Sequence, residues 1–290
     1  MVVIEDMKIG ISLANYGNLP DRDFLRDAAI EIENNNLDSI WLSDHIIVPK
    51  ENTPWNRVFE TITTLGFLAS ITNTVQLGSS IIVVPLRDPF LLAKQIATLD
   101  SLSEGRVLIG AAIGWNEKEF QMINQGFSNR TKIFEKNVEI MKKMWAGGYV
   151  EDGFSCEPMP KSPNGPPILI GGQSEGALKR VAVTGDGWHP VGISSQQYLD
   201  GMQKILDMKR QDYFWSLRIN FAANQKISSQ YTGTDGGPRL RLVGNTDAII
   251  SQIQEYQKVG LQHLVCDIRA DSKEEYFGQL KIVAEIKKSF

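Results

Sequence analysis

The stretch VQLGSSIIVVPLRDPFLLAKQIATLDSLSEGRVLIGAAIG, residues 75–114, contains a strand, a helix and a second strand in direct succession. Its two ends are short β-branched runs. The segment between them has apolar residues at helical spacing, opened by Asp88 and Pro89 and closed at Gly105. Strands joined through a helical crossover run parallel. This stretch therefore predicts a βαβ unit.

The same alternation extends outward from this unit over the whole chain. Strands are predicted at 8–13, 39–43, 75–84, 106–114, 167–172, 187–192, 217–222 and 263–268. Helices are predicted at 21–36, 57–70, 88–103, 131–147, 174–185, 195–210, 246–260 and 272–290. Eight parallel strands, each followed by a helix, specify a single-domain α/β fold, a (β/α)8 TIM barrel with insertion loops, over residues 1–290.

An open, doubly wound sheet is the alternative fold. Its dinucleotide fingerprint G-x-G-x-x-G is missing, because GAAIGW and GGQSEG have a different glycine spacing. Residues 148–166 and 223–241 are longer than ordinary barrel loops. They are either insertions that cover a site or solvated surface loops.

Composition restricts the class of partner. The chain is 42% hydrophobic and 22% charged with a formal net charge of −4, which argues against a basic face for nucleic acid or anionic membranes. Two cysteines, Cys156 and Cys266, are too few for a disulfide framework or a cysteine-rich metal site. No signal peptide is evident, and no apolar run approaches the roughly 20 residues of a membrane helix. We expect a cytoplasmic protein that acts on a small-molecule substrate.

The histidines give a positional test, because catalytic residues of such barrels collect at the carboxyl ends of the strands. Asp44 and His45 end the second predicted strand, and His189 ends the sixth. His263 precedes the eighth strand and is expected at the opposite, stabilising end. A functional role is favoured for His45, whereas functional and structural roles are equally supported for His189.

The third and fourth strands also carry unusual residues. Ser79 and Ser80 precede four β-branched residues, which indicates either a bulge or a chance polar insertion. Trp115 follows a run of small residues and forms either an aromatic wall at the mouth or a contact beneath a loop. Arg87, in the loop after the third strand, is expected at the surface, with anion binding as the alternative. Glu117 and Glu119 are expected to have structural roles at the start of a helix.

The fifth strand leads into the sequence GGQSEG. Gly171 and Gly172 allow close approach of a ligand to the backbone. Gln173 and Ser174 lie at or just before a helix N-cap, whose N–H groups attract phosphate. No Walker loop, nucleophile elbow, deaminase signature or metal-ligand cluster occurs.

These motifs, in this order, resemble the bacterial-luciferase-like flavin oxidoreductase family. The matching stretches are SIWLSDHIIVP (39–49), LGSSIIVVPLRDPFLLAKQIATLDSLSEGR (77–106), IGAAIGWNEKEF (109–120), NRTKIFEKNVEIMKKMW (129–145) and PPILIGGQSEGALKRVAVTGDGWHP (166–190). The resemblance implies a (β/α)8 barrel that binds either reduced FMN, for oxygen chemistry, or the deazaflavin coenzyme F-420, for hydride transfer.

The resemblance also implies roles for single residues. His45 matches the family's active-site histidine, and Asp44 is expected to hold it through a hydrogen bond or to tune its pKa. The pair of serines at 79 and 80 occupies the place of a non-proline cis peptide behind the flavin ring. The loop at 171–174 matches the one that meets the cofactor phosphate. Substrate-side residues are Asn15 and Tyr16, for which a simple turn is the alternative, with Trp115 and His189.

Two departures bear on the chemistry. The family's deazaflavin-dependent sugar-phosphate dehydrogenases have a glutamate in place of Trp115, and the IIVP run replaces a tryptophan after the histidine. Oxidation of that sugar phosphate is therefore not expected. Hydride transfer with F-420 is the leading hypothesis, and a reduced-FMN monooxygenase using dioxygen is the alternative. A non-catalytic flavin-binding barrel is an alternative of another class, and a homodimer is expected from the resemblance.

Overall fold

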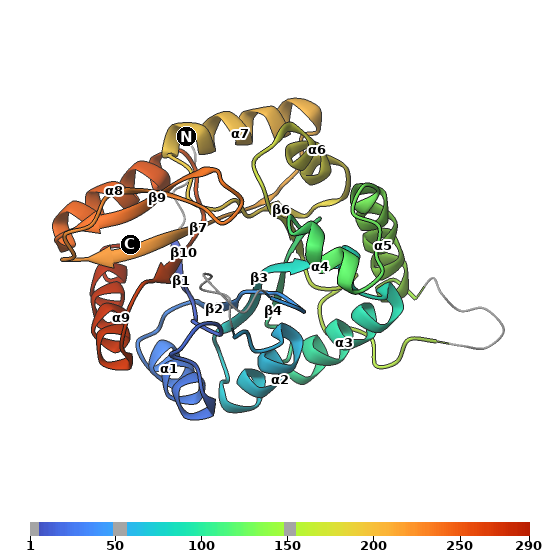
Figure 1. The fold of residues 1–290 in the computed structure, drawn as a ribbon, viewed down its shortest axis with the longest axis horizontal. Coiled ribbons are helices and arrows are strands. Elements are labelled where there is room, and N and C mark those ends of the chain that lie inside the picture. Colours follow the sequence, from blue (N-terminus) through green and yellow to red (C-terminus); the bar gives the residue numbers. More distant parts are fainter. Residues whose placement is uncertain (1–5, 49–56, 148–154) are drawn as a thin grey trace.

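Eight parallel strands close into a ring at the centre of the molecule, with helices around it (Figure 1). The computed structural model describes residues 6–48, 57–147 and 155–290. Residues 49–56, and residues 148–154 of the predicted long loop at 148–166, lie outside the described residues. The ring consists of β1 (Lys8–Ser12), β2 (Ser39–Leu42), β3 (Gln76–Val83), β4 (Val107–Ala112), β5 (Ile168–Ile170), β6 (Gly187–Trp188), β7 (Phe214–Ala223) and β10 (His263–Ile268).

Neighbouring strands of the ring pair in chain order, and β10 pairs with both β7 and β1, which closes the barrel. The predicted single-domain (β/α)8 fold is therefore confirmed. The surrounding helices are α1 (Arg22–Asn34), α2 (Thr61–Ile71), α3 (Pro89–Leu102), α5 (Arg130–Trp145), α6 (Glu175–Thr184), α7 (Ser195–Met208), α8 (Thr246–Lys258) and α9 (Lys273–Lys287). A 3-10 turn, η1 (Val84–Leu86), follows β3 and was not predicted. A short helix, α4 (Glu117–Met122), follows β4, and it begins where Glu117 and Glu119 were expected to start a helix.

Side-chain caps fix where several helices begin. Asp88 accepts a hydrogen bond from the N–H of Leu91 at the start of α3, and Pro89 occupies the first helical position. Ser174 and Ser194 cap α6 and α7 in the same way. These caps orient the loops that precede the helices, which are the loops at the carboxyl ends of the strands.

The stretch 223–241 is not the simple loop that its length predicts. It contains β8 (Gln230–Thr232) and most of β9 (Pro238–Gly244). The last four residues of β7, 220–223, pair in parallel with β9, and β9 pairs antiparallel with β8. The physical reason is the short β6, which pairs with only the first two residues of β7 and leaves the far part of that edge open.

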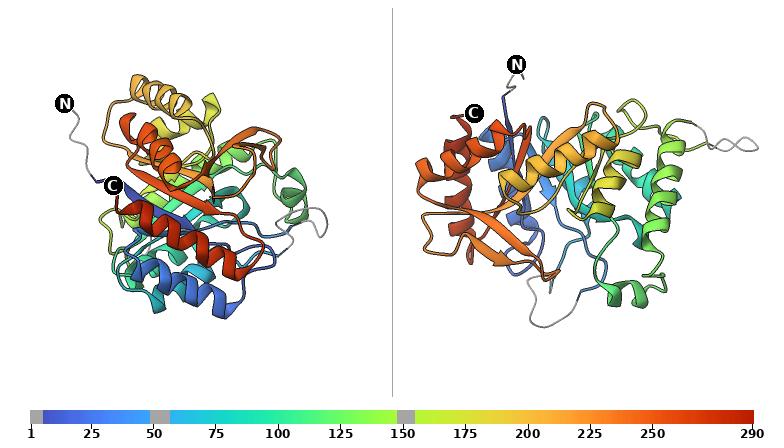
Figure 2. Two further views of the ribbon diagram at one scale, coloured as in Figure 1. Left: turned by 90° about the vertical axis from the view of Figure 1, so that its left-hand side faces the viewer. Right: turned by 90° about the horizontal axis from the view of Figure 1, so that it is seen from above.

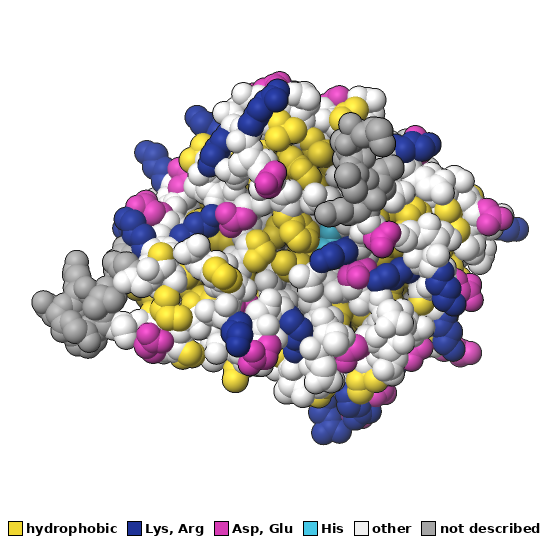
Figure 3. Space-filling model, turned by 180° about the vertical axis from the view of Figure 1, so that it is seen from behind, with side chains coloured by type: hydrophobic (Ala, Val, Ile, Leu, Met, Phe, Trp, Pro, Cys, Tyr) yellow, Lys and Arg dark blue, Asp and Glu magenta, His cyan; other side chains and the backbone are white. Residues whose placement is uncertain are grey.

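The carboxyl ends of the strands form one end of the barrel, called here the mouth. In the right-hand view of Figure 2, α4 and the β8–β9 hairpin lie at this end. Figure 3 shows the end opposite the mouth, where basic, acidic and apolar side chains are interspersed. Among the described residues, no helix is both long enough and apolar enough to cross a membrane.

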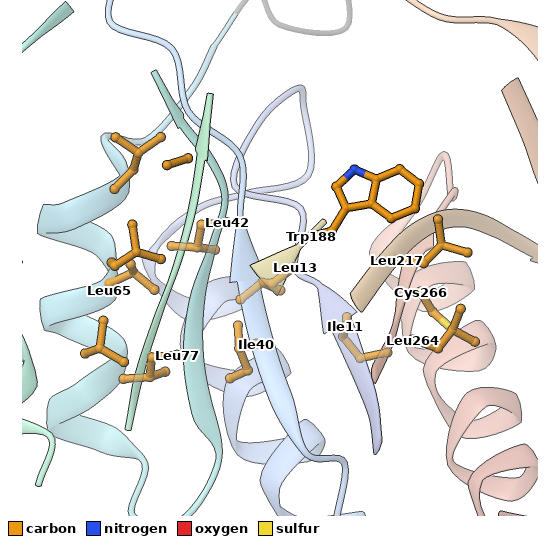
Figure 4. Packing of buried hydrophobic residues seen from close by; sticks show 14 of the residues in the cluster. Ile11, Leu13, Ile40, Leu42, Leu65, Leu77, Trp188, Leu217, Leu264 and Cys266 are labelled. Carbon is orange, nitrogen blue, oxygen red and sulfur yellow. The ribbon is translucent and has the colours of Figure 1, made fainter. Parts of the chain in front are cut away.

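The strands bury both of their faces. Alternate residues such as Ile11, Ile40 and Leu42 point toward the helices, where they meet residues such as Leu65 of α2 (Figure 4). The residues between them point into the barrel. Apolar packing inside the barrel comes from Trp41, Leu108, Leu169 and Val265. Burial on both faces explains why several strands read as nearly continuous apolar runs.

Gly78 lets the indole of Trp41 lie against the bare backbone of β3. A Cβ at this position would fall on the Trp41 ring, which is completely buried. Gly78→Ala is expected to lower the free energy of unfolding by about 1–3 kcal/mol, because the core is overpacked.

Gly66→Ala is the matched control. Gly66 is an exposed residue of α2 with open space around the added Cβ, so this substitution is expected to raise the free energy of unfolding by about 0.5–1 kcal/mol. Urea unfolding measures both changes. Shifts of the same sign would contradict the proposed contact between Trp41 and β3.

Candidate active site

The turn that follows β2 is held by Asn15, which follows β1. The Asn15 amide nitrogen donates to the carbonyl oxygens of Ser43 (2.8 Å) and Phe59 (3.0 Å). Its amide oxygen accepts from the N–H of Ser43 (3.0 Å). Asn15 is completely buried. This predicted substrate-side residue therefore fixes the backbone that presents the next residues, Asp44 and His45.

Asp44 forms an ion pair with Arg87 and not a hydrogen bond with His45. Both terminal nitrogens of Arg87 donate to the Asp44 carboxylate at 2.7 Å. The hydroxyl of Thr61 (2.9 Å) and the N–H of Val83 (3.0 Å) also donate to it. The expected hydrogen bond between Asp44 and His45 is therefore absent, and Arg87 is mostly buried in an ion pair and not on the surface, because a buried carboxylate needs charged and hydrogen-bonding partners and this arginine lies within reach.

His45 pairs instead with Glu119 on α4. Nδ1 of His45 lies 3.0 Å from Oε2 of Glu119. Oε1 of Glu119 accepts from the N–H groups of Ile46 (2.7 Å) and Ile47 (3.2 Å). Burial opposes the charge of Glu119, but these hydrogen bonds and the neighbouring His45 outweigh it and lower the pKa of the carboxyl group. The ionised Glu119 holds the Nδ1–H tautomer of His45, which leaves Nε2 as the proton-accepting nitrogen.

Sequence patterns assigned Glu119 to the helix dipole and so missed its contact with His45. The signal that separates it from Glu117 is the amphipathicity of α4. Glu119 and Phe120 are its buried residues, whereas Glu117 is exposed. An acid on the buried side of a helix that follows a barrel strand needs a partner at the mouth.

Trp115 borders the pair formed by His45 and Glu119. Its ring lies edge-on to the His45 ring, with 6.1 Å between centroids and an interplanar angle of 86°. Trp115 is 46% exposed, so part of the indole next to the imidazole faces solvent. This arrangement has the geometry of an aromatic wall.

Ser79 and Ser80 lie in a bulge of β3. The register with β4 shifts between Ser79 and Ile82, and the peptide bond between Ser80 and Ile81 is cis. The predicted bulge is thus confirmed, and the cis bond lies one residue later than the resemblance implies. The Ser79 hydroxyl donates to the carbonyl oxygen of Gly110 (2.9 Å), which ties the bulge to β4.

His189 lies below the mouth and is completely buried. Its Nε2 is 2.8 Å from the Ser80 hydroxyl, its Nδ1 is 2.7 Å from the Ser216 hydroxyl, and its ring stacks on Trp41. Burial, together with the charge of Arg218, lowers the pKa of His189 to about 3, so the ring is neutral at physiological pH. His189 was predicted on the substrate side, but the structure places it in the floor beneath the mouth.

Arg218 on β7 completes this floor and was missed by the sequence analysis. One terminal nitrogen donates to the Ser80 carbonyl oxygen (2.7 Å) and the Ser43 hydroxyl (3.0 Å), and the other donates to Asp267 (2.9 Å). Burial opposes its charge, but Asp267 outweighs burial and raises the pKa of Arg218. The available signal is the alternation within β7, which points a set of polar residues into the barrel: Ser216, Arg218 and Asn220.

The predicted phosphate loop lies next to the bulge. A Cβ on Gly171 would come within 2.5 Å of Cδ1 of Ile81, so this side chain would have to shift to accept it. Gly172 has a φ of +95°. Gln173 and Ser174 are exposed, and Ser174 caps the ten-residue helix α6. The exposed N–H groups of this helix start form the type of site that binds a phosphate.

The structure therefore brings together much of the predicted site at the mouth. His45 and Trp115 border it, Ser80 and His189 lie in its floor, and the loop at 171–174 adjoins the bulge of β3. Tyr16 also lies on this side, and burial followed by the charge of Asp267 raises the pKa of its hydroxyl. Within residues 6–48, 57–147 and 155–290, no group of three or more His, Cys, Asp or Glu side chains is arranged to hold a metal ion.

Comparisons with known proteins give a family and a set of relatives. The model of the luciferase-like monooxygenase family matches residues 7–210. An uncharacterized protein of Mycobacterium tuberculosis is 31% identical over 142 residues, which are 46% of this chain and 50% of that protein. The F-420-dependent glucose-6-phosphate dehydrogenase of Kineococcus radiotolerans is 28% identical over 199 residues, 63% of this chain and 56% of that enzyme. Pyrimidine monooxygenase RutA of Allorhizobium ampelinum is 29% identical over 143 residues, 46% of this chain and 39% of that enzyme. The chain thus matches about half of the length of these relatives or less.

Solved structures share the fold over nearly the whole chain. An F-420-dependent secondary alcohol dehydrogenase in complex with an F-420–acetone adduct has a TM-score of 0.80 at 16% identity, covering 97% of this chain and 98% of that one. The oxygenating constituent of 3,6-diketocamphane monooxygenase of Pseudomonas putida, in complex with FMN, has a TM-score of 0.76 at 14% identity with the same coverage. The family model matches most of the sequence, so the chain belongs to the luciferase-like monooxygenase family.

Proposed function

We propose that this chain is an oxidoreductase that binds a flavin-type cofactor at the barrel mouth and carries out hydride transfer with the deazaflavin coenzyme F-420. The observation that carries the proposal is the contact of His45 with Glu119 beside a half-exposed Trp115. A histidine whose tautomer is fixed by a buried carboxylate is suited to moving a proton at a substrate oxygen.

The residues at the mouth fit a planar ring that carries a phosphate. Gly171 and Gly172 leave no side chain between the bulge of β3 and the start of α6. The backbone of residues 172–174 would hold the phosphate, and the Ser80 region would lie against the ring. When bound, such a cofactor supplies a hydride donor or acceptor, or, as reduced FMN, a site for reaction with dioxygen.

The side chains of this protein have separate tasks in the proposed reaction. Nε2 of His45 accepts the proton of a substrate hydroxyl during oxidation and returns it during reduction. Glu119 stabilises the imidazolium that forms. Trp115 shields one side of the substrate from water. Arg218 keeps a positive charge in the floor of the mouth.

The choice of F-420 over FMN is supported by the extent of similarity. The relative named as F-420-dependent aligns over 63% of this chain, against 46% for RutA. The FMN-dependent monooxygenase is the second candidate, and the similarity to RutA favours it. The homodimer and the cytoplasmic location stay predictions.

Substitution of His45 tests catalysis against simple binding. His45→Ala is expected to lower kcat by about 10²–10⁴-fold while leaving the affinity for the cofactor nearly unchanged, because the imidazole acts on the proton and not on the phosphate or ring. Glu119→Gln is expected to cause a smaller loss of kcat, because the imidazole stays but the charge is lost, and one amide oxygen cannot accept from both Nδ1 of His45 and the N–H groups of Ile46 and Ile47.

Glu117→Gln is the matched control on the same helix, since Glu117 is exposed, and it is expected to leave kcat unchanged. Steady-state kinetics and fluorescence titration of the cofactor give the two readouts. Turnover at the wild-type level in His45→Ala would favour the non-catalytic flavin-binding barrel.

The cofactor is tested by fluorescence titration of purified apoprotein with F-420 and with FMN, side by side. We expect tighter binding of F-420. Gly171→Ala is expected to weaken binding of the preferred cofactor, because the added Cβ displaces the loop from Ile81. Gly278→Ala, in α9 with open space around the added Cβ, is the control and is expected to bind normally.

Oxygen uptake separates the two enzyme chemistries. Substrate-dependent consumption of dioxygen with reduced FMN, together with tighter binding of FMN, would replace the hydride-transfer proposal by the monooxygenase alternative.

A further inference from the structure

Four arginines, named here the arginine wall, face the mouth from three adjacent strands. They are Arg218 on β7, Arg239 and Arg241 on β9, and Arg269 just after β10. The pairing of β9 with β7 explains this arrangement, because Arg241 lies beside Asn220 in a parallel ladder and paired residues project to the same side.

Asn220 points inward, so Arg241 does as well. With the Asn220 amide oriented to satisfy its neighbours, its nitrogen donates to Asp267 (2.8 Å) and its oxygen accepts from Nε of Arg269 (3.2 Å). Arg239 lies two residues before Arg241 on β9 and therefore on the same face.

The arginine wall has more positive than negative charge. Asp267 lies 2.9 Å from Arg218 and 3.7 Å from Arg269, and Asp235 pairs with Arg239. Among the described residues, no carboxylate lies within ion-pair distance of Arg241. Two carboxylates thus face four guanidinium groups, and the surplus is two positive charges.

Buried donors on the wall also lack partners. The guanidinium of Arg241 lies 4.5 Å from the centre of the Tyr231 ring, and its Nε is buried without a hydrogen-bond partner in the described structure. Nε of Arg218 also has no hydrogen-bond partner in the described structure, and this side chain is more than nine-tenths buried. Orphaned buried donors are costly, so the polar groups of the wall are incompletely compensated by the protein itself.

The phenol of Tyr231 lies at the same place, with its ring against the Arg241 guanidinium. Burial, followed by the charge of Asp267, raises the pKa of Tyr231, so its hydroxyl stays protonated at physiological pH. The site combines surplus guanidinium groups with a protonated hydroxyl, and an oxyanion matches both.

We infer that the arginine wall binds an oxyanion, a carboxylate or phosphate group, of the substrate, so that the substrate is a small organic acid. The assignment of this anion to the substrate rests on the proposed function, whereas the anion site itself does not. The wall is distinct from the loop at 171–174, which follows β5 and would hold the phosphate of the cofactor. An oxyanion elsewhere on the cofactor has the same chemistry, and the experiment separates the two sources.

The test uses the full chain without cofactor and isothermal titration with succinate and with inorganic phosphate at low ionic strength. Succinamide, the neutral analogue of succinate, is the ligand control. We expect succinate or phosphate to bind and succinamide not to bind. Arg241→Gln and Arg269→Gln are each expected to weaken anion binding by about tenfold, because each removes a charge-assisted contact.

Arg210→Gln is the matched control, because it removes the same charge from an exposed residue that follows α7 at the other end of the barrel. It is expected to bind the anion as tightly as the unsubstituted chain. Circular dichroism and thermal unfolding check that each variant is folded. Unchanged binding in folded Arg241→Gln and Arg269→Gln, equal binding of succinamide, or no binding of either anion overturns the inference.

Titrations of the same variants with FMN and F-420 identify the source of the anion. Weakened succinate binding with unchanged cofactor affinity supports a substrate site. A tenfold loss of cofactor affinity in the same variants overturns the assignment to the substrate. If the unsubstituted chain binds neither cofactor and still binds succinate through Arg241 and Arg269, the proposed function fails and the oxyanion site stands.

Discussion

The buried guanidinium of Arg218 is the interaction on which the mouth of the barrel depends. It connects β7 to the bulge of β3 through the Ser80 carbonyl oxygen, to the turn after β2 through Ser43, and to β10 through Asp267. A positive charge at this depth is tolerated only because a carboxylate and several acceptors surround it, and losing one of these partners leaves an uncompensated buried charge. The positions of these three segments are therefore coupled to one another through a single side chain.

The same requirement applies to two further pairs at the mouth, which have different tasks. Asp44 and His45 are adjacent in sequence, yet their side chains find different partners, Arg87 and Glu119. The first pair has two charged hydrogen bonds and no contact with solvent on the carboxylate, so it fixes the loop after β2 against the exit of β3. The second pair stands beside the half-exposed Trp115, where a proton can be exchanged with a ligand. A sequence cannot distinguish these roles from adjacency alone, because the partners come from other strands.

Periodicity predicted the eight strands and eight long helices of the ring, because each of these elements carries its own apolar pattern. The bulge was also predictable, since Gly78, Ser79 and Ser80 are weak strand formers within an apolar strand. In contrast, β9 pairs with an edge that exists only because β6 is shorter than β7, which is a property of the assembled barrel. Glu119 and Arg218 were missed for the same reason. Glu119 is 74 residues from His45, and Arg218 is 138 residues from Ser80.

The arginine wall and His45 lie at different places in the ring, so substrate binding and proton transfer would use different side chains. The wall spans β9, β7 and β10, whereas His45 follows β2, which is separated from β10 only by β1. A substrate anchored on the wall and reacting at His45 would keep its anion in place during the proton transfer. Contacts with the anion are then the same before and during the reaction and act on KM, whereas the proton transfer at His45 acts on kcat. The distance of the arginines from His45 also has a physical reason, since a nearby cation would repel the imidazolium that forms during proton transfer, whereas Glu119 attracts it.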